Sequence, residues 1–385
     1  MSNLIIPFRA NLLETGSPPI DALFKITIDT TKPGSTNSQS FQLSFAYLST
    51  VNFTVDWGDG TSDVITTWDQ AELIHAYASS GTYQVSIDGS FSGIQFYNRD
   101  SKKLMSLDNW GSHVFTTMSY AFYKCENIIA NYTDTPNTTG VQDFSQMFDD
   151  CRMFNGAVEF DTSSAIDMYG MFNNCFVFNQ PVNFDTSNVT RMQIMFNNNW
   201  VFNQPVNFDT SKVTSTTFMF ASARKFNQPI NWNAPLLTNT TSMFFSALEF
   251  NSPVTLTTSS LLFNISSTFR KAPVFNSLVT ISDTSGVGTM GRMFDEAFAF
   301  DQDISAFDPS SLETIAVGGG GAWYMMASIP WSTLNYDKLL IAWDAYGTSD
   351  CRFTAGSAKY SAGAAATAKA NMISRGWQIF DGGQV

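Results

Sequence analysis

Residues 171–194 read MFNNCFVFNQPVNFDTSNVTRMQI, and the next segment, which begins at residue 195, carries FNQPVNFDTSKVT almost unchanged. The phenylalanine of Met-Phe returns in steps of 24 or 25 residues through the middle of the chain. It stands at Phe148, Phe172, Phe196, Phe220, Phe244, Phe269 and Phe294, and Phe122, 26 residues before Phe148, is a diverged first member. So fixed a period is typical of near-identical coils that bury their apolar sides against one another.

The positions within the repeat predict a local structure for each part of the coil. The alternation of Val182, Asn183 and Phe184 predicts a short strand with asparagine on the outer face. The apolar i, i+3 spacing of Met-Phe-x-x-Cys/Ala favours one short helical or 3₁₀ turn. The asparagine of Phe-Asn is expected to point inward and to bond backbone groups between coils. The slot three residues after the repeated phenylalanine is mostly small: Cys125, Cys151, Cys175, Asn199, Ala223, Ala247, Ala272 and Ala297.

One coil cannot bury its own aromatic row, but stacked coils can. Burial of each phenylalanine stabilises the fold by roughly 1.5–3 kcal/mol, which gives a physical reason for 35 phenylalanines in 385 residues. Coils in register repeat at about 4.8 Å, so about eight of them predict a rod on the order of 40 Å long.

The repeat Met-Phe-x-x-Cys/Ala-x-x-Phe-Asn-Gln-x-Val/Ile, followed by Asp-Thr-Ser-x-Val-Thr, resembles the lipoprotein-type surface repeat of the BspA-like leucine-rich-repeat class. The resemblance extends over roughly residues 115–310. It implies a leucine-rich-repeat-like solenoid, and it implies the adhesin-like role of the bacterial and viral surface proteins in that class.

The residues before the repeats read as a separate all-β domain. Segments 24–28, 41–45, 52–57 and 83–87 alternate or end in hairpin-type turns, which favours an immunoglobulin-like β-sandwich over residues 21–100. The motif Trp57-Gly-Asp-Gly-Thr61, with His75-x-Tyr77 and Gly81-x-Tyr83 after it, resembles the PKD domain. That resemblance implies a spacer or a ligand-binding module.

The predicted organisation is therefore mainly β. An extended arm over residues 1–20 precedes the PKD-like sandwich of residues 21–100, a solenoid of about eight coils follows over 101–330, and a small α/β cap closes it over 331–385. In the cap, residues 336–343 and 362–374 read as helices and 377–380 as a last strand. A cap is expected because the open end of a solenoid exposes its core.

Composition excludes several classes of function. The net charge is −13 and no basic patch is present, which argues against nucleic-acid binding. No apolar run reaches the length of a membrane span. His75 and His113 are the only histidines and CxxC is absent, so no metal and no cofactor is expected. Cys125, Cys151 and Cys175 share one repeat slot, where buried thiols or one disulfide between neighbours are both open.

Catalysis is not expected, because GxSxG, HExxH and nucleotide-binding motifs are all missing. A polysaccharide-degrading enzyme with paired carboxylates is the remaining catalytic alternative, although Asp161, Asp185 and Asp209 recur as periodic turn residues. The N-terminal residues lack the features of a secretory signal. Two explanations are open: a phage virion protein, such as a fibre, decoration or tail-associated component, or a chain whose leader has been removed, as for a bacterial cell-surface adhesin.

The predicted binding surface is the outer row of the strand positions. Its members are Glu159, Asn183, Asn207, Asn231 and Thr255. Such a flat polar row suits a glycan or a protein backbone, and the alternative is a merely solvated strip. The expected partners are a host surface protein or glycan through this row, and other virion proteins through the arm and the PKD-like domain. Homo-oligomers are also possible partners, whereas nucleic acid and membrane are not expected.

Overall fold

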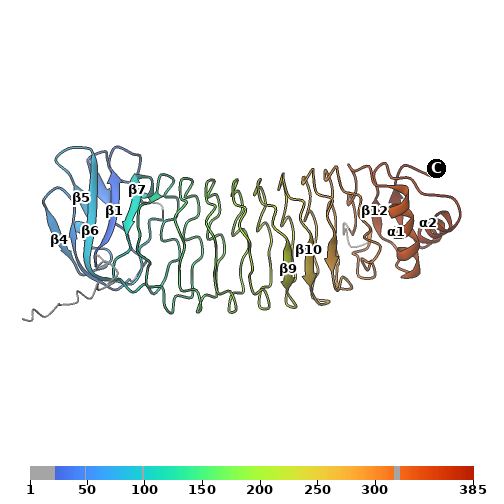
Figure 1. Ribbon diagram of the computed structural model, residues 1–385, viewed down its shortest axis with the longest axis horizontal. Helices are drawn as coiled ribbons and strands as arrows, with labels where there is room; N and C mark the ends of the chain where they lie inside the picture. Colours follow the sequence, from blue (N-terminus) through green and yellow to red (C-terminus); the bar gives the residue numbers. More distant parts are fainter. Residues whose placement is uncertain (1–21, 48, 98, 316–320) are drawn as a thin grey trace, which may run out of the picture.

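The computed structural model describes residues 22–47, 49–97, 99–315 and 321–385. It is a rod with a β-sheet domain at the N-terminal end, a solenoid along the middle and two helices at the C-terminal end (Figure 1). The mainly β class is as predicted, and the solenoid has about 11 turns rather than eight. The predicted arm of residues 1–20 and most of the glycine run 318–321 lie outside the described residues.

The N-terminal domain is built on a six-stranded sheet in the order β4-β3-β6-β1-β7-β8, with a separate two-stranded sheet of β2 and β5. Alternate residues of β1 are buried, because one face of the sheet packs on the core. Strand β7 continues this sheet beyond residue 100 and pairs in parallel with β8, so the sheet runs directly into the first coils. The elements are β1 Phe24–Asp29, β2 Ser40–Gln42, β3 Val51–Asp56, β4 Ser62–Ile65, η1 Ala71–Leu73, β5 Ile74–Ala76, β6 Thr82–Phe91, η2 Ser101–Lys103, β7 Leu104–Asn109 and β8 Ile129–Ala130.

The residues of the PKD-like motif pack against one another inside this domain. The Trp57 Nε1 donates to Asp63 Oδ2 at 2.8 Å, and the Tyr77 hydroxyl donates to the Trp57 carbonyl at 3.1 Å. The His75 ring stacks on Trp57 with centroids 4.8 Å apart and its Nε2 lies 2.9 Å from Asp59 Oδ2. The motif therefore fixes the hairpin turn and the adjoining strand through packing and hydrogen bonds.

The solenoid coils are joined by a ladder of parallel backbone hydrogen bonds. Within one coil, the backbone N–H of Met168 and of Phe172 donate to the carbonyls of Arg191 and Met195 in the next coil, each at 3.0 Å. The segment Met-Phe-x-x-Cys, for which the sequence favours one short helical or 3₁₀ turn, forms tight i, i+3 turns and no helix. In one of these turns the Cys175 N–H donates to the Phe172 carbonyl, with an N···O distance of 3.2 Å. Successive turns place apolar side chains at the same i, i+3 spacing. They leave the other backbone N–H groups available to donate to carbonyls of the next coil.

These turns require left-handed backbone at two positions in each coil, four residues apart. In one coil these two positions are occupied by Gly170 (φ 59°) and Asn174 (φ 58°). The same two slots hold Ile194 and Asn198 in the next coil, with φ of 52° and 57°. Glycine and asparagine tolerate this conformation, whereas a β-branched side chain brings Cβ close to the carbonyl oxygen.

Replacing Ile194 with glycine is therefore expected to stabilise the protein. Relief of the left-handed conformation contributes about 1–2 kcal/mol, and the extra backbone entropy of glycine opposes it by about 0.5–1 kcal/mol. A net gain of about 0.5–1 kcal/mol should appear as a raised midpoint in chemical denaturation. Gly170→Ile, the reverse change in the same slot one coil earlier, should destabilise the protein. A destabilised Ile194→Gly would show that the Ile194 side chain contributes more through packing than its backbone loses.

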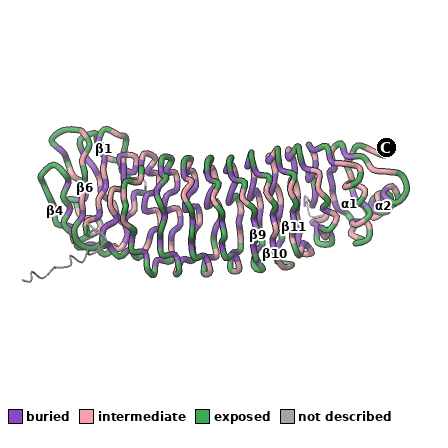
Figure 2. Tube along the Cα trace, viewed as in Figure 1, coloured by how far each residue is buried: buried purple, intermediate pink, exposed green. Residues whose placement is uncertain are grey.

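Two columns of stacked phenylalanines form the core of the rod, as the repeat predicted. In the column of the Met-Phe rings, neighbours lie 5.4–5.8 Å apart and within 11° of parallel. The column of the Phe-Asn rings is parallel to it, and Phe172 and Phe178 of one coil are 4.2 Å apart. Buried and exposed residues alternate along each coil (Figure 2). The aromatic column confirms the predicted interior of the solenoid.

The asparagines of Phe-Asn do bond the backbone between coils, but their inward direction is wrong. The Asn179 N–H donates to Asn155 Oδ1 and the Asn203 N–H to Asn179 Oδ1, each at 2.9 Å. The same bond links Asn227, Asn251 and Asn276 to the coil before each, at 2.7–2.9 Å. Most of these side chains are exposed. The ladder therefore runs along the outer edge of the rod.

Regular parallel strands form in the second half of the solenoid. Among the described residues of the repeats they are β9 Ile230–Asn233, β10 Val254–Thr257 and β11 Val279–Ile281. At 182–184 and 206–208 the predicted alternation of buried and exposed residues is present without regular strand structure. The prediction of which side chains face inward is thus confirmed in these coils, while regular strand pairing is confined to the later coils.

The stacked cysteines are free thiols in the structure. Cys125, Cys151 and Cys175 are fully buried and unpaired. Burial raises the pKa of the Cys151 and Cys175 thiols well above the ordinary value. Each of these two donates to a carbonyl of the previous coil, with Cys175 Sγ 3.0 Å from the Phe148 oxygen. The thiols therefore fill the small slot and satisfy a backbone acceptor.

The C-terminal segment continues the solenoid while adding helices to it. Ala322 pairs in parallel with Phe353, and β12 pairs in parallel with β13, so the ladder extends two coils beyond the repeats. Helices α1 and α2 pack on each other at the end of the rod (Figure 1). Both helices and the last strand are where the sequence predicted them. The elements are α1 Thr333–Ala345, β12 Arg352–Thr354, α2 Ala364–Ser374 and β13 Gln378–Phe380.

Candidate functional site

The five predicted binding residues lie on one face of the rod. Asn231 and Thr255 are direct neighbours in the parallel pairing of β9 and β10. Glu159 and Asn183 line the same surface cavity, which has a volume of about 620 Å³. Glu159, Asn183, Asn207 and Asn231 are exposed, and Thr255 is half-buried. We call these five residues the outer row. The structure brings them into line, one for each coil, at the coil spacing of about 4.8 Å.

The amides of the outer row are not used in the fold. Asn183, Asn207 and Asn231 make no side-chain hydrogen bond with any residue that the structure describes, and Glu159 has no ion pair there. Other repeated asparagines differ in this respect: Asn197 Nδ2 donates to Asn173 Oδ1 at 2.8 Å and is part of a ladder within the protein. The outer row therefore presents a series of free donors and acceptors to an external ligand.

A row of aspartates flanks the outer row two residues further along each of three coils. Asp161, Asp185 and Asp209 each accept a hydrogen bond from the N–H of the serine two residues later, at 2.9–3.1 Å. Hydrogen bonds from these serines lower the pKa of all three carboxyls, which are therefore ionised at neutral pH. On the other side, exposed Pro181 and Pro205 border the row. The face thus combines free amides, fixed carboxylates and rigid apolar rings.

Both histidines pack against aromatic rings. His75 stacks in the N-terminal domain, and His113 is buried beside Phe91, with ring centroids 4.4 Å apart. In the described ranges, no three or more His, Cys, Asp or Glu side chains gather closely enough to hold a metal ion. Among the same residues, no helix is both long enough and apolar enough to cross a bilayer.

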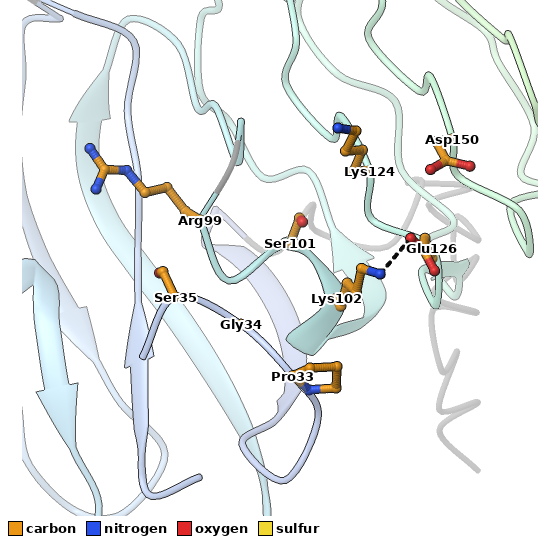
Figure 3. Close-up of a pocket in the computed structure, with 9 residues that line it drawn as sticks. All are labelled: Pro33, Gly34, Ser35, Arg99, Ser101, Lys102, Lys124, Glu126 and Asp150. Atoms are coloured by element: carbon orange, nitrogen blue, oxygen red, sulfur yellow. Dashed lines mark ion pairs between the residues drawn. The ribbon is translucent and has the colours of Figure 1, made fainter. Parts of the chain in front are cut away.

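One surface feature was missed from the sequence. A second cavity, of about 510 Å³, lies where the N-terminal domain meets the first coils, and Arg99, Lys124 and Asp150 are among its lining residues (Figure 3). These residues come from three separate segments and share no repeat position. Their meeting depends on how the loop at 33–35 folds against the solenoid, for which the sequence carries no periodic signal.

The family described as "Mycoplasma protein of unknown function, DUF285" matches the chain over residues 92–184, 116–207, 181–277 and 255–317. The first two matches begin 116 − 92 = 24 residues apart, which is one coil. Together the matches cover residues 92–317, more than half of the 385 residues. None of the curated proteins and none of the solved structures compared with the chain matches it.

Proposed function

The chain belongs to the DUF285 family of repeat proteins, and on that premise we propose that it is a non-enzymatic surface protein whose solenoid binds a host surface protein or glycan. The outer row carries this proposal. Its amides recur on successive coils and are free of hydrogen bonds within the protein. A ligand that lies along the rod meets the same donor and acceptor pair at each coil, which suits an extended glycan or an extended peptide backbone.

The rigidity of the rod supports this role. The backbone ladder and the two ring columns fix the spacing of the amides before any ligand arrives, so little side-chain and backbone order has to be gained on binding. Each amide contact is weak, but contacts on several coils act together. A long, regular face of repeated polar groups suits attachment, whereas catalysis needs a concave site with perturbed groups.

Replacing both Asn183 and Asn207 with arginine is expected to weaken attachment to host cells at least tenfold without unfolding the protein. Both side chains are exposed and free, so arginine fits sterically but blocks the row. The measurement is the binding of labelled protein to intact cells, with circular dichroism as the test of folding. Val177→Arg/Val201→Arg places the same charges on another edge of the same two coils, at residues 37 % and 40 % exposed. Equal binding by both double variants would remove the outer row as the site.

Two locations are compatible with this function. The first is a phage virion, in which the N-terminal arm and a PKD-like N-terminal domain anchor the chain to other virion proteins. The second is a bacterial cell surface, and the family's description as a Mycoplasma protein supports a bacterial source. Copurification with capsid or tail proteins in symmetric copies supports the first location, and recovery in the cell-surface fraction supports the second. Release of sugar from host polysaccharide by the purified chain would contradict a non-enzymatic role.

A further inference from the structure

The cavity between the N-terminal domain and the solenoid has the features of a second, separate site. Its volume is about 510 Å³, which is in the range of small-ligand sites. One wall is the loop at 33–35, another is the segment 99–102, and the third comes from the first coils of the solenoid (Figure 3). We call it the junction cleft.

A buried polar network holds the loop wall of the junction cleft in place. The carboxylate of Asp100 accepts from the Ser35 hydroxyl at 3.1 Å and from the backbone N–H of Thr36 and Gln42 at 3.0 and 2.8 Å. Directly behind it, Lys103 Nζ, whose side chain is completely buried, donates three hydrogen bonds of 2.7 Å to the segment 36–40. The loop is thus tied down before any ligand binds, and the cleft is preformed.

The charged groups around the junction cleft are only partly paired. Lys102 Nζ lies 2.8 Å from Glu126 Oε1, as the dashed line in Figure 3 marks. The guanidinium of Arg99, by contrast, forms no hydrogen bond or ion pair with the described residues. Lys124 Nζ contacts the ring of Tyr123 at 5.0 Å and reaches no carboxylate. Two cations without a counter-charge therefore line a cleft in a protein of net charge −13.

The solenoid wall of the cleft carries acceptors. Glu126 and Asp150 stand on this wall together with Lys124, away from Arg99 (Figure 3). Both also bind Arg152, which leaves lone pairs for further donors. Close by, Tyr97 and Tyr123 stack with ring centroids 5.1 Å apart, and Tyr97 is 47 % exposed. A fully anionic ligand such as phosphate would meet repulsion from the two carboxylates, whereas a ligand with one anionic group and several hydroxyls uses both sides.

We propose that the junction cleft binds an acidic saccharide, with the sugar carboxylate on Arg99, and with the sugar hydroxyls accepting from Lys124 and donating to Glu126 and Asp150. The planar guanidinium of Arg99 suits a carboxylate in a bidentate manner. The exposed ring of Tyr97, two residues before Arg99, offers an apolar surface to the sugar ring. This inference rests on the proposed function only in that both make the chain a binding protein, because the outer row takes no part in the cleft.

The test is calorimetric titration of the full chain with 3′-sialyllactose and with digalacturonate. Lactose serves as the neutral match to sialyllactose, and inorganic phosphate serves as the simple anion. At least one acidic saccharide should bind, at least tenfold more tightly than lactose and than phosphate, and raised salt should weaken that binding. Arg99→Ala and Lys124→Ala should each lower the affinity at least fivefold. Lys212→Ala, an exposed cation on the solenoid that hydrogen bonds Asn188, should not change it.

Absence of binding by both acidic saccharides would overturn the proposal. Phosphate binding as tight as the saccharide, or unchanged affinity in both cleft variants, would overturn it as well. The Asn183→Arg/Asn207→Arg variant separates this site from the outer row. It should retain saccharide binding at the cleft while losing attachment to host cells, so failure of either proposal is recognised independently of the other.

Discussion

Truncation of Phe196 to alanine is expected to lower the free energy of unfolding by about 3–5 kcal/mol. The ring is completely buried and stacks on rings in both neighbouring coils and in its own: the centroids of Phe172, Phe220 and Phe202 lie 5.8, 5.6 and 4.2 Å away. The surrounding rings belong to a rigid ladder and cannot collapse into the space, so the cavity remains. Chemical denaturation followed by circular dichroism measures the loss.

The matched control is Phe298→Ala, because Phe298 is 54 % exposed on the surface of a later coil. It should change stability by much less than Phe196→Ala. Because each coil of a repeat protein contacts only its neighbours, the Phe196 cavity should also separate the unfolding of the coils before it from that of the coils after it. An unchanged denaturation midpoint for Phe196→Ala would show that the ring columns do not form the core.

Removal of the Asp100 carboxylate is expected to destabilise the N-terminal domain by about 3–5 kcal/mol, because it leaves the buried charge of Lys103 without a counter-charge. Lys103 Nζ lies 3.6 Å from Asp100 Oδ2 and both side chains are fully buried. The same carboxylate also accepts hydrogen bonds from Thr36 and Gln42, which would lose their acceptor. Thermal unfolding of Asp100→Ala, compared with the natural chain, measures the effect.

Two further variants distinguish a lost ion pair from a general loss of packing. Lys32→Ala breaks an exposed pair with Asp29, whose N···O distance is 3.7 Å, and should cost less than about 1 kcal/mol. Asp100→Leu combined with Lys103→Met removes both charges and should recover much of the stability that Asp100→Ala loses. If the double variant is as unstable as Asp100→Ala, the hydrogen bonds to the loop matter more than the unpaired charge.

The fold could be predicted from the sequence in the segments where the apolar pattern repeats from coil to coil. The 24-residue return of Phe172 and Phe196 indicated the ring column, and the alternation at Val182 to Phe184 indicated which side chains face outward. At Met-Phe-x-x-Cys the expected single turn is present as one of several successive i, i+3 turns, all of which satisfy the same apolar spacing. The left-handed backbone of Ile194 has no signal in the sequence, since isoleucine disfavours it.

The number of coils was underestimated because the ends of the solenoid lose the repeated phenylalanine. Phe96 stacks on Phe122 with centroids 6.3 Å apart and extends the column toward the N-terminus. Ala322 and Phe353 extend the ladder at the other end without a Met-Phe pair. The outer row could be located from the pattern alone, whereas the junction cleft could not, since Arg99 and Asp150 line one cavity only through the tertiary fold.

Amide hydrogen exchange of the natural chain tests most directly that the coils form one continuous ladder. The backbone N–H of Phe172, Phe196 and Phe220 each donate to a methionine carbonyl in the next coil, at 3.0, 2.9 and 2.9 Å. All three amides should therefore exchange slowly and with similar protection, as members of one cooperative stack. Fast exchange at any of them, at the rate of an unprotected amide, would contradict the stacked solenoid on which the proposed binding face depends.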